Sequence, residues 1–182
     1  MNVLFITLEN IIGIAGHSIY TDLLRQFVKN GHEVFIASPA ERRTGIKTTL
    51  YEDPDYPQAH ILKIKTGNIQ KTNIIEKGIS TVLLEGQVYS AIKRYFRNVH
   101  FDLILYSTPP ITIVKPIRFI KRRDKAVTYL MPKDIFPQNS IDLGMLSKNG
   151  PKGVLYRIFR KKERSLYAIS DRIGCMSQAN ID

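Results

Sequence analysis

The chain has 182 residues, of which 43% are apolar and 24% charged, a composition typical of one globular domain with a full core. Its single cysteine, Cys175, excludes an intramolecular disulfide and a zinc site built from several cysteines. The net charge of +11 lies in the second half, because residues 1–91 are neutral and residues 92–182 carry eighteen basic and seven acidic side chains. Such an uneven distribution favours an anionic partner, although a merely soluble basic protein is an open alternative.

The first 28 residues have the pattern of a strand, a glycine-containing turn and a helix. Residues 3–6 are an apolar run too short for an ordinary helix, Gly13 and Gly16 follow, and apolar residues then recur at helical spacing over 19–28. In doubly wound α/β domains such a turn lets backbone N–H groups and a helix N-terminus approach an anion. The spacing G-x-x-G is weaker than a full dinucleotide fingerprint, so phosphate contact and a purely conformational role stand as equal alternatives.

The rest of the chain alternates short apolar runs with helical patterns. We predict further strands over 33–38, 60–65 (at a sheet edge), 101–106, 125–131 and 171–176. Residues 39–57 are predicted as a polar loop, because the run Asp53-Pro54-Asp55-Tyr56-Pro57 cannot continue a helix or a central strand. Helices are predicted over 72–98 (with breaks at Gly78 and Gly86), 112–122, 140–146 and 154–169. The expected fold is α/β, a doubly wound, mostly parallel, Rossmann-like sheet with helices on both faces.

The predicted helix over 154–169 is amphipathic in sequence. Its apolar side carries Leu155, Ile158, Phe159, Leu166 and Ile169. Its opposite side carries Arg157, Arg160, Lys161 and Arg164. The basic side is a candidate anion-binding surface, and a solvated helix face is an equal alternative.

Three loops follow predicted strands at their carboxyl ends, where open α/β sheets bind ligands. They are residues 13–17, 107–110 and 133–138, and we expect them to converge on one crevice. The sequence contains no Walker loop, no G-x-S-x-G nucleophile elbow and no histidine spacing typical of metal ligands, so no metal site is predicted. With no signal peptide pattern and no apolar run of about 18 residues, a cytoplasmic protein is expected.

Several segments in a fixed order carry a family resemblance. They are residues 3–8 with the turn 13–17, the helix that ends in Asn30-Gly31-His32-Glu33-Val34, Phe101-Asp102-Leu103-Ile104, Lys133-Asp134-Ile135-Phe136-Pro137-Gln138, and Ser170-Asp171-Arg172-Ile173 with Ser177. Together they resemble the N-terminal domain of family 4 glycosyltransferases, which have the GT-B fold and use nucleotide sugars. The segment 133–138 is similar to the stretch "R-D-[LIW]-[WF]-P-E" of the subgroup that builds bacterial surface polysaccharides.

The resemblance implies a domain organisation and a reaction. Residues 1–176 would be the Rossmann-like, acceptor-binding domain, and residues 177–182 would begin the crossing to a C-terminal domain that this sequence lacks. The reaction would transfer a sugar from a nucleotide-sugar donor to a saccharide or polyprenyl-diphosphate-linked acceptor, with retention of configuration, in polysaccharide or lipopolysaccharide synthesis. No cofactor and no metal are implied. Because the family's E-x7-E donor motif lies in the C-terminal domain, the chain alone is expected to be nearly inactive.

The resemblance also implies roles for particular residues. Gly13 and Gly16 would lie beside the donor phosphate, and Thr108 and Lys133 would be further substrate or phosphate contacts. His17 and Asp134 are the candidate catalytic residues, with local capping at the start of a helix or turn as the alternative for each. The chain departs from the family in its G-x-x-G spacing, and it has Ser107-Thr108-Pro109-Pro110 where some members carry a histidine.

Two expectations concern partners. Arg157, Arg160, Lys161 and Arg164 could rest on anionic headgroups at the inner face of the cytoplasmic membrane, where each charge contributes about 1 kcal/mol. The alternative from a different class is a non-catalytic Rossmann-like module that binds a nucleotide or nucleic acid. Nucleic acid is not the expected partner, because the sequence contains no recognisable nucleic-acid-binding module.

Overall fold

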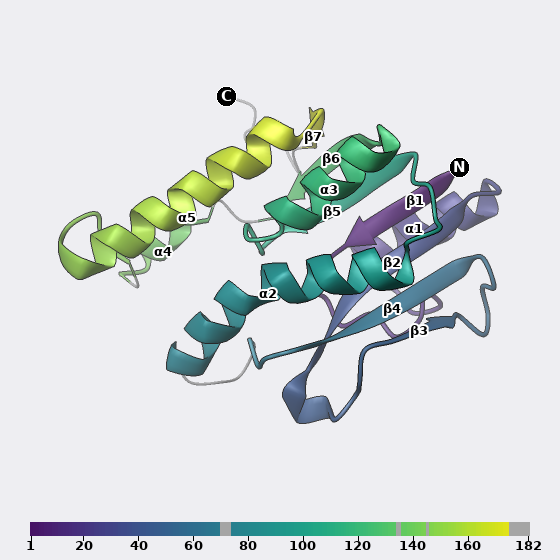
Figure 1. Ribbon diagram of the computed structural model, residues 1–182, viewed down its shortest axis with the longest axis horizontal. Coiled ribbons are helices and arrows are strands. Elements are labelled where there is room, and N and C mark those ends of the chain that lie inside the picture. The colour runs from purple at the N-terminus through teal and green to yellow at the C-terminus, as the bar shows by residue number, and fades with distance from the viewer. Residues whose placement is uncertain (70–73, 134–135, 145, 175–182) are drawn as a thin grey trace.

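The fold is an α/β sheet sandwiched between helices, as a computed structural model shows (Figure 1). The structure describes residues 1–69, 74–133, 136–144 and 146–174. Within them a seven-stranded sheet has the order β3-β4-β2-β1-β5-β6-β7. Its strands are β1 (Asn2–Ile6), β2 (Glu33–Glu41), β3 (Thr49–Glu52), β4 (Ala59–Thr66), β5 (Leu103–Thr108), β6 (Val127–Pro132) and β7 (Arg172–Ile173). Every pairing is parallel except β3 with β4, which confirms the predicted doubly wound, mostly parallel sheet.

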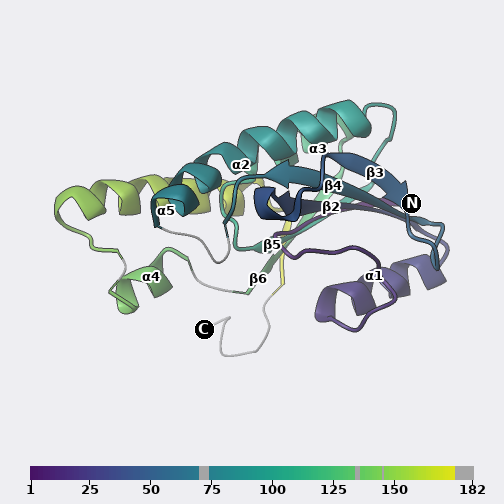
Figure 2. The ribbon, with the colours of Figure 1, turned by 90° about the horizontal axis from the view of Figure 1, so that it is seen from below.

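The helices cover both faces of this sheet. They are α1 (Ile19–Lys29), α2 (Ile74–Tyr95), α3 (Val114–Asp124), α4 (Gln138–Asp142) and α5 (Gly150–Ile169). Figure 2 shows α1 on one face and α2 and α3 on the other. The chain runs outward from β1 to β2 and β4, then returns to place β5 on the other side of β1. The order of strands therefore reverses between β1 and β5, the point at which open α/β sheets form a ligand crevice.

The start of α1 is fixed by its own sequence. Ser18 caps the helix, because its Oγ accepts a hydrogen bond from the N–H of Thr21 (3.2 Å) while Thr21 Oγ1 accepts one from the N–H of Ser18 (2.8 Å). The chain leaves the helix through Gly31, whose φ of 76° lies in the left-handed region that glycine adopts without strain. Helix α1 therefore begins near the carboxyl end of β1, where the order of strands reverses.

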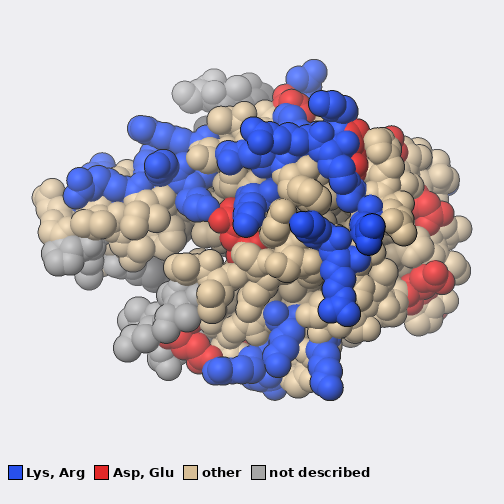
Figure 3. Space-filling view, viewed as in Figure 1, with Lys and Arg blue, Asp and Glu red and all other residues tan. Residues whose placement is uncertain are grey.

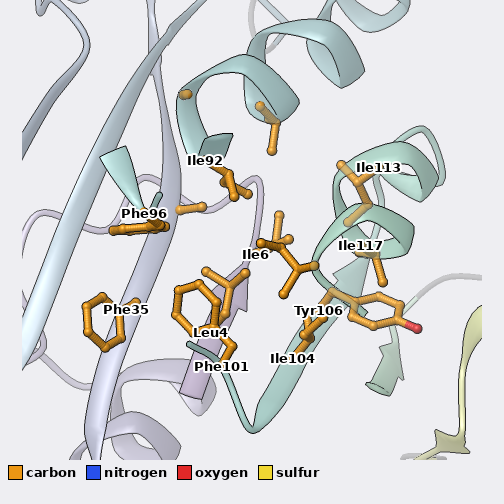
Figure 4. Close-up of a cluster of buried hydrophobic side chains, with 14 of the residues drawn as sticks. Leu4, Ile6, Phe35, Ile92, Phe96, Phe101, Ile104, Tyr106, Ile113 and Ile117 are labelled. Atoms are coloured by element: carbon orange, nitrogen blue, oxygen red, sulfur yellow. The ribbon is translucent and has the colours of Figure 1, made fainter. Parts of the chain in front are cut away.

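The larger core lies between the sheet and helices α2 and α3 (Figure 4). Phe35, Phe96 and Phe101 form an aromatic cluster there, with ring centroids 5.3–5.6 Å apart in edge-to-face arrangements. A second core lies under α1, where the rings of Phe5 and Tyr20 are 5.0 Å apart. Both cores pack against β1, so the strand that leads into the glycine turn is held from both faces.

Three sequence predictions were wrong in this region. The loop predicted over 39–57 contains the end of β2, the 3-10 turn η1 (Arg42–Thr44) and strand β3. Because β3 pairs with β4 in the antiparallel direction, the strand predicted over 60–65 does not lie at the sheet edge. Helix α2 also continues through Gly78 and Gly86. Buried side chains of this helix, such as Leu84 and Ile92, anchor it and outweigh the cost of about 1 kcal/mol for each glycine.

The predicted helix over 154–169 is confirmed as part of α5, but its apolar side is only partly covered. Leu166 is buried and Phe159 and Ile169 pack against the larger core, whereas Leu155 and Ile158 are 42% and 53% exposed. Lys162 pairs with Glu85 of α2 (2.5 Å), and Glu85 also accepts the N–H of Lys115 at the start of α3 (2.9 Å), which places Lys162 near the carboxyl edge of β5. Figure 1 shows the part of α5 before Lys162, which is about 18 Å of helix, reaching beyond the ends of β5 and β6. Phe159 of this part still packs against the core and against Phe136, but Leu155 and Ile158 remain largely exposed.

Candidate functional site

Strands β1, β5 and β6 end side by side, and their carboxyl ends bring two of the predicted loops together. Thr7 Oγ1, just after β1, lies 3.4 Å from Ser107 Oγ in β5. The N–H of Lys133, just after β6, donates to the carbonyl oxygen of Thr108 (3.3 Å). Thr108 itself is buried at the end of β5. Thr108 and Lys133 therefore adjoin each other at the edge of the sheet, as the sequence predicted.

Tyr20 of α1, which follows the loop 13–17, also lies at this edge. The Nζ of Lys133 lies 4.2 Å from the centroid of the Tyr20 ring, a cation–π contact. Tyr20 is in the first turn of α1, two residues after its cap, so the exposed Lys133 is positioned beside the N-terminus of that helix. The Tyr20 hydroxyl is buried and has no hydrogen-bond partner among the described residues. The start of α1, just after the turn 13–17, thus lies with the ends of β5 and β6 at one edge of the sheet, whereas residues 134 and 135 of the third predicted loop lie outside the described residues.

Asp53 accepts a hydrogen bond from the turn that contains the two glycines. One carboxylate oxygen of this buried residue accepts the N–H of Ile14 (2.6 Å), and the other accepts the N–H of Asp55 (2.9 Å). A Cβ on Gly13 would lie only 3.2 Å from the Asp53 carboxylate. Gly13 thus allows the close packing of the turn on Asp53. Gly16 is exposed, and a Cβ there would meet no atom within 4 Å, although its carbonyl oxygen accepts hydrogen bonds from Thr21 Oγ1 and Arg25.

His17 lies just before Ser18, the cap of α1, with 90% of its side chain exposed. Its Nδ1 is 3.3 Å from a carboxylate oxygen of Asp22, and the same carboxylate pairs with Arg25. The guanidinium of Arg25 also donates to the carbonyl oxygens of Ile14 and Gly16. Nδ1 also lies 3.3 Å from Nη2 of Arg25, so Asp22 and Arg25 both contact this side of the imidazole ring. A neighbour at one imidazole nitrogen orients the ring and leaves the other nitrogen available for proton transfer.

A buried lysine anchors the first part of the same loop. Lys63 of β4 is 1% exposed, and its Nζ donates to Asn10 Oδ1 (2.5 Å), to the carbonyl oxygen of Ile11 (3.1 Å) and to Ser38 Oγ (2.9 Å). Ser38 Oγ accepts in turn the N–H of Ile11 (2.9 Å). Because burial disfavours the charged ammonium, the pKa of Lys63 is lowered from 10.5 to about 8.

This lowered pKa predicts how stability changes with pH. Between pH 8 and 10.5 the folded state has released the Lys63 proton while the unfolded state still binds it, so the free energy of unfolding should rise with pH relative to that of Lys63→Met. Below pH 8 both states bind the proton, and the difference should be constant. Urea denaturation of both proteins at several pH values measures this. Lys65→Met, at an exposed neighbour, should show no such trend, and a flat difference for Lys63→Met would contradict the burial effect.

Asp53, Lys63 and Arg25 support the site, and sequence reasoning did not find them. Asp53 and Lys63 are 39 and 52 residues from the backbone groups that they bind, Ile14 and Ile11. Both stand in segments whose local patterns indicated only a loop and an ordinary strand. For Arg25 the only local indication was its position, two helical turns after the cap Ser18.

The remaining predicted site residues are distributed as follows. Asp134 lies outside the described residues. Arg157, Arg160, Lys161 and Arg164 border one open groove along α5, and Arg160 also pairs with the buried Glu163. Among the described residues no three His, Cys, Asp or Glu side chains are placed to hold a metal ion. In the same part of the chain no helix is both long and apolar enough to cross a bilayer.

Two solved structures show the same fold. The alignment with the glycosyltransferase of kitacinnamycin has a TM-score of 0.52 and 13% identity, and it covers 90% of this chain and 40% of that one. The alignment with the E. coli trehalose-6-phosphate synthase bound to UDP-2-fluoro-glucose has a TM-score of 0.59 and 6% identity, and it covers 98% of this chain and 41% of that one. No protein-family model and no curated protein sequence matches the chain.

These likenesses define the class of fold. Both neighbours are GT-B glycosyltransferases, and the mostly parallel sheet described here matches their Rossmann-like architecture. The chain therefore has a Rossmann-like fold that matches one part of these GT-B structures. It spans about 40% of the length of each neighbour.

Proposed function

We propose that this chain is the N-terminal, acceptor-binding domain of a retaining glycosyltransferase of family 4. It would act with a C-terminal domain that holds most of the nucleotide-sugar site. The acceptor would be a saccharide or a polyprenyl-diphosphate-linked saccharide used in bacterial cell-surface polysaccharide synthesis. The observation that carries the proposal is the carboxyl edge of β1, β5 and β6 in a fold that matches GT-B glycosyltransferases, where a braced glycine turn, a helix N-terminus and a cation lie close together.

Each of the features at this edge of the sheet would serve one requirement of sugar transfer. The diphosphate leaving group gains negative charge, and the exposed backbone at Gly16, the N-terminus of α1 and the ammonium of Lys133 would stabilise that charge. His17, oriented by Asp22, is the candidate for contact with the acceptor or the reacting centre. Asp134, next to Lys133 in the sequence, keeps its proposed catalytic role. No metal or cofactor is required for these roles.

The four basic residues of α5 support an acceptor that lies at a membrane surface. Arg157, Arg160, Lys161 and Arg164 border a groove on the exposed side of the helix, where they would contact anionic headgroups. A polyprenyl-linked acceptor is held in such a membrane, so peripheral attachment at its inner face would bring enzyme and acceptor together.

A transfer assay on the full reading frame tests this proposal. We expect the frame to contain about 150–200 further residues with a glycine-rich loop and an E-x7-E pair. The encoded protein is incubated with nucleotide sugars and polyprenyl-diphosphate-linked acceptors, and the product is followed by mass spectrometry. His17→Ala should lower turnover about 100-fold or more, whereas His32→Ala, at the opposite edge of the sheet, should not. If His17→Ala turns over at the wild-type rate, His17 is not a catalytic residue. Absence of transfer with every donor would favour a non-catalytic binding module.

A further inference from the structure

The first half of α5 exposes aliphatic side chains that a soluble helix would normally bury. Val154, Leu155 and Ile158 are 52%, 42% and 53% exposed. Val154 and Ile158 are four residues apart and therefore lie one above the other on the same face of the helix. This part of α5 extends past the sheet, as the pairing of Lys162 with Glu85 shows, so the described core does not cover these side chains.

Cations flank this aliphatic strip. Arg157 and Lys161 lie on the adjacent helix face, four residues apart, and Arg164 continues the row. None of the three forms an ion pair with another described residue, whereas Arg160 pairs with Glu163. A second open groove, bordered by Arg118, Arg122 and Lys125, shares Ala168 with the groove on α5. Figure 3 shows Lys and Arg predominating over α5 and α3.

This surface also lies near the candidate functional site. Residues of α5 before Lys162 extend past the edge at which β1, β5 and β6 end, and Thr7, Ser107 and Lys133 lie at that same edge. A flat anionic surface that contacted the first half of α5 would therefore lie next to the candidate functional site.

We propose that the first half of α5 is an interfacial helix that inserts Val154, Leu155 and Ile158 into an anionic lipid surface while Arg157, Lys161 and Arg164 contact the headgroups. This inference rests on the proposed function for its biological purpose, and it adds apolar insertion to simple headgroup contact. A helix with an aliphatic strip beside a row of cations is the form that binds in the plane of a membrane interface. Nucleic acid could contact the cations and Tyr156, which lines the same groove, but it would leave the aliphatic strip exposed to water.

Vesicle sedimentation of the chain separates the two contributions. Vesicles of phosphatidylglycerol and phosphatidylcholine should bind the unsubstituted chain, and pure phosphatidylcholine vesicles should bind it far more weakly. Replacing Arg157, Lys161 and Arg164 by glutamine should weaken binding to anionic vesicles about 100-fold. Replacing Lys29, Lys47 and Lys65 by glutamine removes the same charge from exposed sites elsewhere, and it should have little effect.

The aliphatic strip has its own test. Replacing Val154, Leu155 and Ile158 by glutamine should weaken vesicle binding about tenfold or more and leave a remainder that high salt abolishes. Ile46→Gln with Leu50→Gln, at exposed aliphatic positions on the β3 side, should bind like the unsubstituted chain. Circular dichroism confirms that each variant is folded. Unchanged binding of the α5 variant at every salt concentration would overturn insertion.

A fluorescence measurement reports insertion directly, because the chain contains no tryptophan. Ile158→Trp should show a blue-shifted emission with anionic vesicles and quenching by lipids brominated in the acyl chain, and Leu50→Trp should show neither. Emission of Ile158→Trp that stays at its aqueous position on bound protein would overturn the proposal. Equally tight binding to a DNA duplex at physiological salt would assign the cations to nucleic acid instead. None of these readouts depends on sugar transfer, so this inference and the proposed function can fail separately.

Discussion

Phe96→Ala is expected to lower the free energy of unfolding by about 3–5 kcal/mol, the range typical of truncating a buried phenylalanine. Phe96 is fully buried at the end of α2, and its ring packs edge-to-face against Phe35 of β2 and Phe101 just before β5. An alanine would leave a cavity between a helix and two strands that lie on opposite sides of β1. Little relaxation is possible there because the sheet is hydrogen-bonded on both sides.

Urea denaturation followed by circular dichroism measures this loss. Arg97→Ala, the next position on the chain, removes an exposed side chain and should change the free energy of unfolding by about 0.5 kcal/mol or less. A loss below about 1 kcal/mol for Phe96→Ala would mean that the aromatic cluster is not a tightly packed part of the core.

Asp53→Ala is expected to lower the free energy of unfolding by about 3 kcal/mol and to loosen the glycine turn. The substitution leaves the buried N–H of Ile14 without its acceptor and removes the acceptor of Asp55 as well. The local effect should exceed the global one, because the turn between Asn10 and Gly16 depends on Asp53, Lys63 and Arg25 rather than on regular secondary structure.

Hydrogen exchange distinguishes the local effect. The amide of Ile14 should exchange much faster in Asp53→Ala, whereas amides of β1 should change only as far as global stability does. Asp53→Asn keeps one carbonyl acceptor and should give an intermediate result. Asp55→Ala, at the exposed carboxylate two residues away, leaves the bond to Ile14 intact and should protect that amide normally. Protection of Ile14 in Asp53→Ala would contradict this account of the turn.

Most of the framework could be predicted from local patterns. Apolar runs separated by helical periods indicated the strands of a parallel sheet, and Ser18 with the following apolar spacing indicated the start of α1. The proximity of Thr108 to Lys133 followed as well, because loops after parallel strands share one edge of the sheet. Strand β3 was missed because its residues, Thr49–Glu52, are mostly exposed and show no alternation of buried side chains.

The sequence by itself determined the class of fold and the edge at which a ligand would bind, since both depend on short-range hydrophobic periodicity and on the direction of parallel strands. Only the tertiary structure decided which side chains brace the glycine turn and which face of α5 is uncovered. Asp53 and Lys63 bind backbone groups of the turn that are 39 and 52 residues away in the sequence, and a local sequence pattern does not depend on such distant partners. Whether the apolar side of α5 is buried depends on where the sheet ends, and that is set by the packing of α2, α3 and α5 together.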